Sequence, residues 1–438
     1  MQPSENHDDS LFDDLVARGL LYQVTDPALA KQALRRNGNL AVYIGFDPTA
    51  SSLHVGSLLQ ITLLRRLQDW GHHPLAVVGG GTGLIGDPSG KSAERKLLDR
   101  PTLDGHVAAI RAQLSQFLDF DAGRAELIDN HTWLGEVNLL EFLRDIGKHF
   151  SVNAMIARDS VRTRLETRDQ GISFTEFSYM LLQAYDFLEL YRRHSCRAQF
   201  GGSDQWGNIV SGTDLIDRMA APSDSQRAFG LTVPLITMKS GQKFGKTEEG
   251  TVWLDPQLTS PYRFYQFWLG ADDEDVLRWL PAFSLRPFAQ LQPILEEQRI
   301  APHLRPAQKA LAAELTSLVH GAEACQQVQA ATAVLFGGDP KDLSLEALSM
   351  LEAELPTFHG QEREITLQSL LVGSEPGRAF ASNGEARRAM QANSVSINGH
   401  KIAGELASLL PPATLLHDRY ALIRVGKKQF FLAILPQA

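Results

Sequence analysis

The sequence predicts an α/β fold: a Rossmann-like parallel sheet with a helical insertion, followed by an α-helical domain and a small α+β domain. Three short apolar runs without alternation, at 41–44, 74–78 and 231–237, are typical of parallel strands covered on both faces. Glycine-containing turns follow them, and segments of helical periodicity lie between and after them. This order of elements is that of a doubly wound sheet with further domains.

Length and composition limit the classes to which the protein can belong. The 438 residues, 43% of them apolar, are enough for two or three domains with real cores. We found no long uncharged apolar run, and MQPSENHDDS lacks the features of a signal peptide, so we expect a cytoplasmic protein without a membrane segment. Cys196 and Cys325 stand far apart, which argues against a disulfide framework or a cysteine zinc site.

The charge is unevenly distributed. The net charge is −9, but residues 365–438 hold eight Lys/Arg against four Asp/Glu, a local +4. This balance disfavours a protein that coats nucleic acid and predicts polyanion contact at the carboxyl-terminal end alone.

The first strand leads through a polar turn into a helix. Gly45 lets a ligand approach the backbone, residues 47–49 form the turn, Ser51 or Ser52 is predicted to cap the helix, and residues 58–67 carry its apolar stripe. His54 and Ser57 lie three apart at the helix start, where the dipole favours phosphate. The stretch is a nucleotide site in outline, although many strand-turn-helix units bind no ligand.

The second strand enters GGGTGLIGDPSGKS, residues 79–92. A Walker A phosphate loop is the rival interpretation. Its spacing requires four residues between glycine and Gly-Lys, whereas Gly86 and Gly90 enclose three, one of them Pro88. Asp87 would also lie unfavourably beside a phosphate.

The helix at 173–191 begins with a capping box, Ser173 and Glu176. Tyr179, Gln183 and Asp186 then share one face, which lacks the lysines of an ordinary solvated face, so we interpret it as facing a ligand.

Two later strands also end in candidate ligand loops. Strand 198–200 opens into GGSDQWGN, where Gly202 permits close approach and Asp204 and Gln205 can bind ribose hydroxyls at the strand ends. Strand 231–237 is followed by MKSGQKFGKTEEG, a glycine-rich loop whose Lys243 and Lys246 can close on phosphate charge.

The chain from residue 261 is predicted helical, with GGDP at 337–340 and residues 356–360 marking a linker. After it come a helix capped near Ser382 or Asn383, a type I′ turn at Asn398-Gly399, and strands at 420–425 and 429–435.

Several of these stretches resemble one family. GFDPTASSLHVGS resembles the "HIGH" signature of class I aminoacyl-tRNA synthetases in the form used by bacterial tyrosyl-tRNA synthetases, KFGKT resembles the second signature, KMSKS, and EFSYMLLQAYDF resembles the family's tyrosine-binding helix. The carboxyl-terminal module resembles an S-four-type RNA-binding domain. The matches cover nearly the whole chain in family order.

The resemblance implies activation of L-tyrosine with ATP and Mg²⁺ to tyrosyl-adenylate and pyrophosphate, then transfer to the 3′-terminal adenosine of tRNA(Tyr). It implies a homodimer, no protein-bound metal and no membrane contact. Ser57 departs from the family pattern, since it stands where the second His of the first signature is usual.

By residue match, the resemblance assigns four groups of side chains. The tyrosine hydroxyl is held by Tyr43 and Asp186, and its ammonium group by Asp87, Tyr179 and Gln183. Adenosine meets Gly45, Asp47, Gly202, Asp204 and Gln205, with His54 and Lys246 also binding ATP. The phosphates meet the catalytic group of Thr49, His54, Lys91, Arg95, Lys243 and Lys246. RNA contacts are expected from Arg387, Arg388, Lys427 and Lys428.

The expected domains are a helical segment at 1–35, a catalytic domain at 36–258, a helical tRNA-side domain at 259–340, a linker at 341–363 and an RNA-binding domain at 364–438. The catalytic domain contains a dimer-forming insertion at about 105–195 and the KFGKT loop at 243–247. A phosphate-loop NTPase and a non-catalytic RNA-binding protein descended from a synthetase remain alternatives, and tyrosine-dependent ATP–pyrophosphate exchange separates them.

Overall fold

The computed structural model describes residues 10–87, 98–158, 161, 162, 165, 172–239, 244–247 and 250–437. Contacts divide the chain into two compact units. Unit 1 contains Met1–Thr259 and Phe267–Leu311, and unit 2 contains Ser260–Gln266 and Ala312–Ala438. The helical segment predicted at 259–340 is therefore distributed over both units.

Unit 1 is built on a six-stranded sheet with the order β1-β6-β5-β2-β3-β4. The strands are β1 (Gln23–Val24), β2 (Ala41–Phe46), β3 (His73–Val78), β4 (Glu126–Asp129), β5 (Cys196–Gly202) and β6 (Phe229–Val233). All neighbours are parallel except β1 and β6. From β2 the chain turns to β3 on one side and later to β5 on the other, so the strand order switches beside β2, where open α/β sheets bind ligands.

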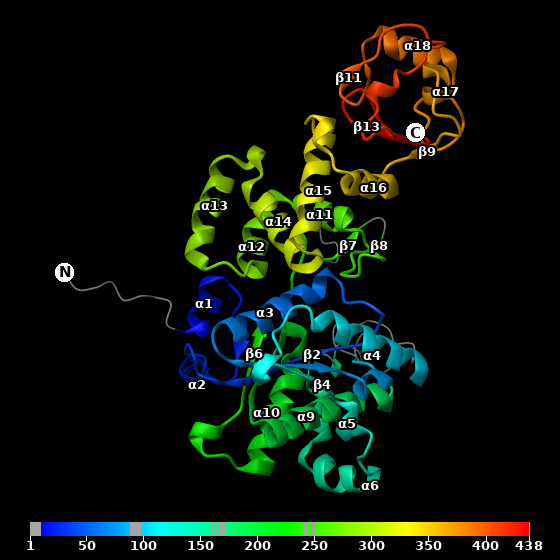
Figure 1. Cartoon of the computed structure of the whole chain (residues 1–438). Coiled ribbons are helices and arrows are strands. Elements are labelled where there is room, and N and C mark those ends of the chain that lie inside the picture. Colours follow the sequence, from blue (N-terminus) through cyan, green and yellow to red (C-terminus); the bar gives the residue numbers. More distant parts are fainter. Residues whose placement is uncertain are drawn as a thin grey trace, which may run out of the picture. The chain divides into compact units, whose positions relative to one another are not determined.

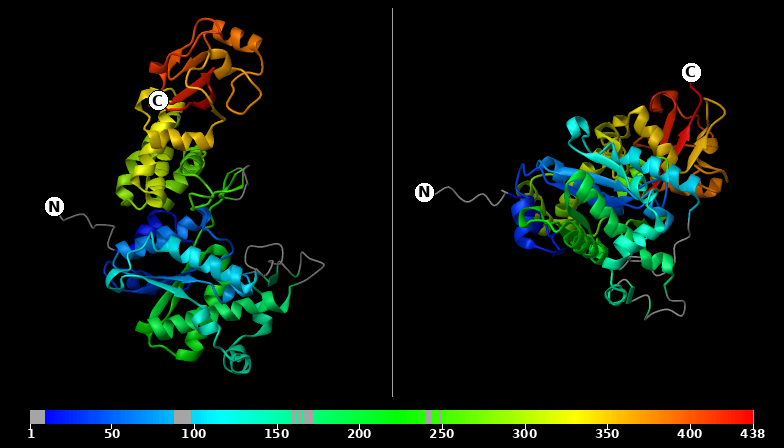
Figure 2. Two further views of the ribbon diagram at one scale, coloured as in Figure 1. Left: turned by 45° about the vertical axis from the view of Figure 1, so that its right-hand side comes forward. Right: turned by 90° about the horizontal axis from the view of Figure 1, so that it is seen from below.

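Helices cover both faces of this sheet (Figures 1 and 2). On one face lie α3 (Leu58–Asp69) and α4 (Arg100–Leu114), and on the other α9 (Phe174–His194) and α10 (Trp206–Ala220). In β2 every residue but Gly45 is buried or nearly so, which explains the absence of alternation. The predicted Rossmann-like class is confirmed.

The start of α3 differs from the prediction. Neither Ser51 nor Ser52 caps it: a 3₁₀ turn, η1 (Val55–Ser57), precedes Leu58, and the Nδ1 atom of His54 accepts the Gly56 N–H at 3.0 Å. Ser52 is buried and its hydroxyl instead donates to the Leu53 carbonyl. The serine prediction was wrong because an imidazole supplies the nearer acceptor.

The boundaries of the predicted insertion, 105–195, also need correction. Residues 126–129 form β4, which pairs in parallel with β3, and α9 packs on the sheet. The strand is only four residues long, too short for a periodic signal. What projects from the sheet is a set of short helices: α5 (His131–Leu134), α6 (Leu139–Glu141), η4 (Phe142–Ile146), η5 (Gly147–His149) and α7 (Val152–Ile156).

Further α-helices precede β2 or follow β6. They are α1 (Leu11–Ala17), α2 (Pro27–Ala33), α11 (Pro261–Leu269), α12 (Asp273–Phe283), α13 (Phe288–Ile300), α14 (Pro306–His320) and α15 (Ala322–Leu335). Two buried arginines bind the carboxyl end of α12. Arg18 donates to the carbonyls of Pro281 and Ser284, and Arg66 of α3 donates to Ala282 and Ser284.

Unit 2 contains a second sheet with the order β11-β10-β12-β13-β9. The elements that follow α15 in unit 2 are α16 (Leu345–Glu354), β9 (Thr357–His359), α17 (Leu367–Leu371), α18 (Asn383–Gln391), β10 (Val395–Ile397), β11 (His400–Lys401), β12 (Tyr420–Val425) and β13 (Gln429–Ile434). The predicted turn is confirmed: Asn398 and Gly399 both have positive φ, 48° and 83°, and join β10 to β11. Ser382 caps α18.

Residues 341–363, predicted as a linker, are folded into unit 2. Strand β9 pairs with β13, and α16 buries Leu348 and Leu351 against alternate residues of β12 and β13 such as Leu422 and Leu432. The glycines and prolines that predicted a linker lie in turns between packed elements of unit 2. Among the described helices, none is long and apolar enough to cross a membrane.

Candidate active site

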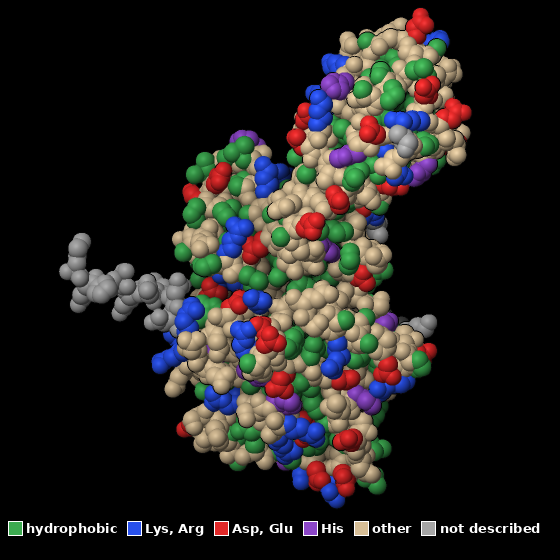
Figure 3. Space-filling view, viewed as in Figure 1, with side chains coloured by type: hydrophobic (Ala, Val, Ile, Leu, Met, Phe, Trp, Pro, Cys, Tyr) green, Lys and Arg blue, Asp and Glu red, His purple; other side chains and the backbone are tan. Residues whose placement is uncertain are grey.

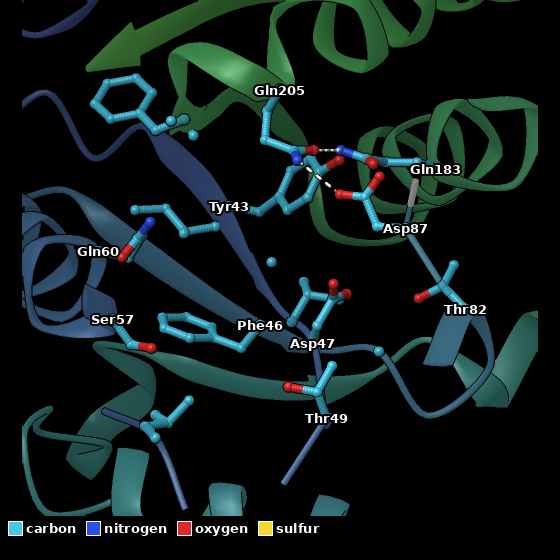
Figure 4. Close-up of a pocket in the computed structure, with 18 of the residues that line it drawn as sticks. Tyr43, Phe46, Asp47, Thr49, Ser57, Gln60, Thr82, Asp87, Gln183 and Gln205 are labelled. Carbon is cyan, nitrogen blue, oxygen red and sulfur yellow. Dashed lines mark hydrogen bonds between the residues drawn. The ribbon is translucent and has the colours of Figure 1, made fainter. Parts of the chain in front are cut away.

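A cavity of about 350 Å³ opens at the carboxyl ends of β2 and β5. The cavity is lined by every residue that was predicted to contact tyrosine, ATP or phosphate and whose side chain is described. These are Tyr43, Gly45, Asp47, Thr49, His54, Asp87, Tyr179, Gln183, Asp186, Gly202, Asp204 and Gln205, and Ser57 lines the cavity as well. Segments far apart in the sequence thus meet at the switch point of the sheet (Figure 4).

Tyr43 and Asp186 line the cavity and are almost completely buried, at 2% and 4% exposed. Asp186 accepts hydrogen bonds from Asn130 Nδ2 at 2.9 Å and from Trp133 Nε1 at 2.7 Å. Burial raises the pKa of Asp186 to about 7, and these two donors act in the opposite direction. The two hydrogen bonds hold the carboxyl group in one orientation. Burial destabilises its ionised form unless a ligand donates a further hydrogen bond.

Tyr43 supplies the complementary group. Its ring packs edge-on against Phe187 with centroids 5.3 Å apart, and within the described chain its buried hydroxyl has no hydrogen-bond partner. Burial, and then the nearby Asp186 charge, raise the pKa of Tyr43 well above its usual value, so the phenol stays protonated. An unsatisfied buried hydroxyl costs about 1–3 kcal/mol, which a ligand hydroxyl at this point would recover.

A chain of amide side chains orients Asp87 within the same cavity. Asn208 Nδ2 donates to Gln183 Oε1 at 2.9 Å, Gln183 Nε2 to Gln205 Oε1 at 3.2 Å, and Gln205 Nε2 to Asp87 Oδ2 at 2.7 Å. Figure 4 shows Gln205 between Gln183 and Asp87, beside the Tyr43 ring. A carboxylate fixed by amides is suited to binding an ammonium group.

The two glycines near the strand ends differ in the space around them. An added Cβ at Gly45 would meet no described atom within 4 Å, whereas at Gly202 it would lie 2.6 Å from Asp204 Oδ1. Burial, and secondly the charge of Asp87, raise the pKa of Asp204. The rim is formed by Thr49, His54 and Ser57, and the His54 ring lies 6.1 Å from that of Trp253.

Four cations are predicted to contact the phosphates. Lys91, Arg95 and Lys243 lie outside the described residues. Lys246 lies in β7 (Lys246–Thr247), which pairs with β8 (Gly250–Thr251). Their convergence on the cavity stays a prediction.

The sequence reasoning missed several residues. Asn130 and Trp133 donate hydrogen bonds to Asp186. They were not predicted because β4, the strand that precedes them, was not recognised from the sequence. Gln199 lies beside Tyr43 in the sheet register, and within the described chain its buried Oε1 atom has no partner. A polar residue inside an apolar strand was the available signal for it.

Two protein-family models match the chain. Residues 35–337 match the family model for class I tRNA synthetases of the tryptophan and tyrosine type, and residues 347–433 match the carboxyl-terminal domain of SYY-like tyrosine–tRNA ligases. The tyrosine–tRNA ligase of Geobacillus kaustophilus is 46% identical over 426 residues, which cover 96% of this chain and 99% of that protein. The chain belongs to the tyrosine–tRNA ligase family. Its activity is therefore the attachment of tyrosine to tRNA(Tyr).

Two further comparisons agree with this assignment. A tyrosine–tRNA ligase of Enterococcus faecalis is 46% identical over 97% of this chain and 99% of its own length. The crystal structure of a C-terminally truncated mitochondrial tyrosyl-tRNA synthetase from Aspergillus nidulans is 31% identical, with a TM-score of 0.67, over 75% of this chain and 94% of that one.

The predicted RNA-binding residues of this family member lie in unit 2. Arg387 and Arg388 are exposed on α18, and Lys427 and Lys428 are exposed in the turn between β12 and β13. The Gly426 N–H donates to the Ser394 carbonyl at 2.7 Å, so this turn lies against the segment that follows α18.

Proposed function

We propose that both half-reactions take place in the cavity at the ends of β2 and β5. The observation that carries this proposal is the buried pair of Tyr43 and Asp186, an unsatisfied phenol beside an acid that is hydrogen-bonded on both oxygens. The substrate phenol donates to Asp186 and accepts from Tyr43. The amide-fixed Asp87 carboxylate, together with Tyr179 and Gln183, binds the ammonium group.

ATP, accompanied by Mg²⁺, lies across the strand ends. Its adenosine contacts Gly45, Asp47, Gly202, Asp204 and Gln205, and its phosphates extend along the rim of Thr49 and His54. The tyrosine carboxylate attacks the α-phosphorus, the bond to the β-phosphate bridging oxygen breaks, and pyrophosphate leaves with its electrons. Lys91, Arg95, Lys243 and Lys246 offset the charge that develops on the phosphates.

A terminal hydroxyl of tRNA(Tyr) then attacks the tyrosyl carbonyl and AMP leaves. Because the adenylate is already activated, positioning and charge stabilisation supply most of the catalysis. We assign tRNA contact to the exposed cations of unit 2, Arg387, Arg388, Lys427 and Lys428, and expect the enzyme to work in the cytoplasm.

We further propose a homodimer formed through the projecting segment of unit 1. Large apolar side chains are exposed there, Leu139 (68%), Leu140 (75%) and Val152 (57%), and Phe174 (78%) is exposed where α9 begins. On the face shown in Figure 3, apolar side chains reach the surface where α6 lies in Figure 1. A self-complementary patch would bury them in a symmetric dimer. Sedimentation should give a dimer that Leu140→Asp dissociates, and a monomeric wild-type protein would contradict the proposal.

The activity is tested by ATP–pyrophosphate exchange that depends on tyrosine. Exchange in the presence of tyrosine, but not of phenylalanine, is the expected result. Release of free phosphate without exchange would favour a phosphate-loop NTPase. Tyrosine-dependent exchange that survives Asp186→Ala unchanged would remove this cavity from the reaction.

A further inference from the structure

Helices α9 and α10 lie so close together that their side chains meet in pairs. An added Cβ at Gly212 of α10 would lie 2.8 Å from Cδ1 of Phe187 in α9, so the helices approach more closely than a side chain at this position would allow. One turn earlier on each helix, the same two faces carry Asn208 and Gln183. Asn208 Nδ2 donates to Gln183 Oε1 at 2.9 Å. The packing of the two helices therefore sets the place of Asn208.

Asn208 fixes the direction of the hydrogen bonds that lead to Asp87. Its side chain is buried, and it does not line the cavity, whereas Gln183 and Gln205 do. Asn208 Nδ2 donates to both glutamines, to Gln183 Oε1 at 2.9 Å and to Gln205 Oε1 at 3.2 Å. Because an amide nitrogen can only donate, both glutamines must turn their oxygen atoms toward Asn208.

The orientation of Gln205 then decides which atom Asp87 meets. Gln205 Oε1 also accepts from Gln183 Nε2 at 3.2 Å, so both of its lone pairs are used. Its Nε2 atom is left to donate to Asp87 Oδ2 at 2.7 Å, as Figure 4 shows. If this amide were reversed, an oxygen atom would face the carboxylate and repel it. We call Asn208, Gln183, Gln205 and Asp87 the Asn208 network.

An ammonium group offers donors only, so the atoms that bind it must be acceptors. At the proposed ammonium subsite these are the Asp87 carboxylate, Gln183 Oε1 and the Tyr179 hydroxyl. We infer that Asn208 is a positioning residue through which the enzyme selects the amino group of its substrate. Asn208 touches no substrate atom in this account, and it acts by holding the amides of Gln183 and Gln205 in the orientation that suits a cation. The inference rests on the proposed function, since it names the residue that orients the proposed ammonium subsite.

The test compares two ligands that differ only in the ammonium group, L-tyrosine and 3-(4-hydroxyphenyl)propanoate. Calorimetry on the full-length enzyme at pH 8 gives both dissociation constants, and the constant for the propanoate divided by that for tyrosine is the amine ratio. Asn208→Leu, and Asn208→Asp, which keeps the shape but offers no donor, should each lower the amine ratio about tenfold. The affinity for the propanoate should stay within about twofold, whereas tyramine, which keeps the ammonium group, should lose affinity as tyrosine does.

A matched control separates positioning from stability. Ser211 also lies buried in α10, and its hydroxyl donates to the Gly207 carbonyl at 2.8 Å. Ser211→Ala removes a buried hydrogen bond of the same helix but no bond of the Asn208 network, so it should lower the Tm and keep the amine ratio within about twofold. An equal fall of the ratio in Ser211→Ala and Asn208→Leu would mean that packing alone is measured, and it would overturn the inference. Should Asn208→Leu fail to fold, Asn208→Asp and Asn208→Ala carry the test.

Asp87→Asn distinguishes a failure of the inference from a failure of the proposed function. This change should itself lower the amine ratio, and Asn208→Leu should lower it little further in the Asp87→Asn enzyme. If Asp87→Asn lowers the ratio and the Asn208 variants do not, the inference is wrong and the proposed ammonium subsite stands. If Asp87→Asn leaves the ratio unchanged, the ammonium group is bound elsewhere, and the inference fails together with the proposed subsite.

Discussion

At the scale of single residues, the tyrosine subsite is defined by the cost of leaving polar groups unpaired. Tyr43 and Asp186 are almost completely buried, and Asn130 and Trp133 fix the carboxyl group in place. A substrate hydroxyl would pair with both groups, whereas phenylalanine would leave them unsatisfied. Such a site discriminates strongly without editing, and tyrosyl-tRNA synthetase is the established general example of this principle.

Tyr43→Phe should relax the preference for tyrosine over phenylalanine while ATP use stays nearly intact. The change removes one of the two groups that phenylalanine leaves unpaired, which corresponds to roughly 1–3 kcal/mol. The measurement is the ratio of kcat/KM for the two amino acids in pyrophosphate exchange. Tyr22→Phe, at a tyrosine that is 60% exposed, is the matched control, and an unaltered ratio in Tyr43→Phe would place recognition of the phenol elsewhere.

Asp186→Asn should change the pH dependence of stability in the absence of tyrosine. The pKa of Asp186 is raised from 3.8 to about 7 in the folded protein, so the folded state binds the extra proton between these values. The contribution of Asp186 to the stability of the wild type therefore falls as pH rises from about 4 to 7, and it does not recover above pH 7. The Tm of Asp186→Asn minus that of the wild type should increase from pH 5 to pH 8. Asp214→Asn, at a partly exposed carboxylate, is the control. A difference in Tm between Asp186→Asn and the wild type that stays constant from pH 5 to pH 8 would contradict this prediction.

At the scale of elements, the end of α12 shows how the catalytic sheet and the following helices are held together within unit 1. Arg66 and Arg18 reach from α3 and from the end of α1 to carbonyl oxygens that no longer have helical partners. Periodicity predicted these helices, but the contact joins residues more than 200 positions apart, and no local pattern indicates it.

Arg66→Ala should destabilise the protein by about 2–4 kcal/mol, because it leaves buried carbonyl groups without a donor. Its neighbour Arg65→Ala is the matched control, since Arg65 pairs with Asp69 and both side chains are at least 40% exposed. The control should cost less than about 1 kcal/mol. Chemical denaturation measures the free energy of unfolding of both variants. Equal losses would show that the buried contacts of Arg66 stabilise the protein no more than the exposed ion pair of Arg65.

Two elements escaped prediction because tertiary partners decided them. The four residues of β4 form a strand because they pair with β3 at the edge of the sheet. The turn before α3 is closed by His54 rather than by serine, since Gln113 of α4 donates to the Ser52 hydroxyl at 2.9 Å and keeps it in a different network. In both cases the local sequence is compatible with more than one structure, and a tertiary partner selects one of them.

At the scale of the whole molecule, truncation should separate the two half-reactions. A chain ending at residue 338 should still perform tyrosine-dependent pyrophosphate exchange, because the sheet and its cavity belong to unit 1. Transfer to tRNA should decline, and the salt dependence of tRNA binding should weaken, since the exposed cations of unit 2, which lie in the +4 segment 365–438, are removed. Normal charging by this truncated enzyme would contradict the assignment of RNA contact to unit 2.

The cut should not be placed near residue 360. Such a chain would keep α16 and β9 but lose the sheet against which they pack, exposing Leu348 and Leu351. We expect lower solubility and a lower Tm than for the chain that ends at 338, and the reverse order would show that α16 is stable without its sheet.

The sequence by itself determined the class of fold, the order of the signatures and the chemistry they carry. Apolar runs define parallel strands, glycines define the turns, and the polar stripe of α9 indicated a ligand. These are local properties, encoded within one element at a time. The type I′ turn at Asn398-Gly399 and the cap at Ser382 were predictable for the same reason.

Only the tertiary structure decided which residues complete the site. Asn130, Trp133 and Gln199 join Tyr43 and Asp186 because strands β2, β3, β4 and β5 are adjacent in the sheet, although they are distant in sequence. The raised pKa of Asp186 is likewise a property of burial among several elements. Pairing and burial depend on contacts between elements, and one sequence read along its length does not specify those contacts.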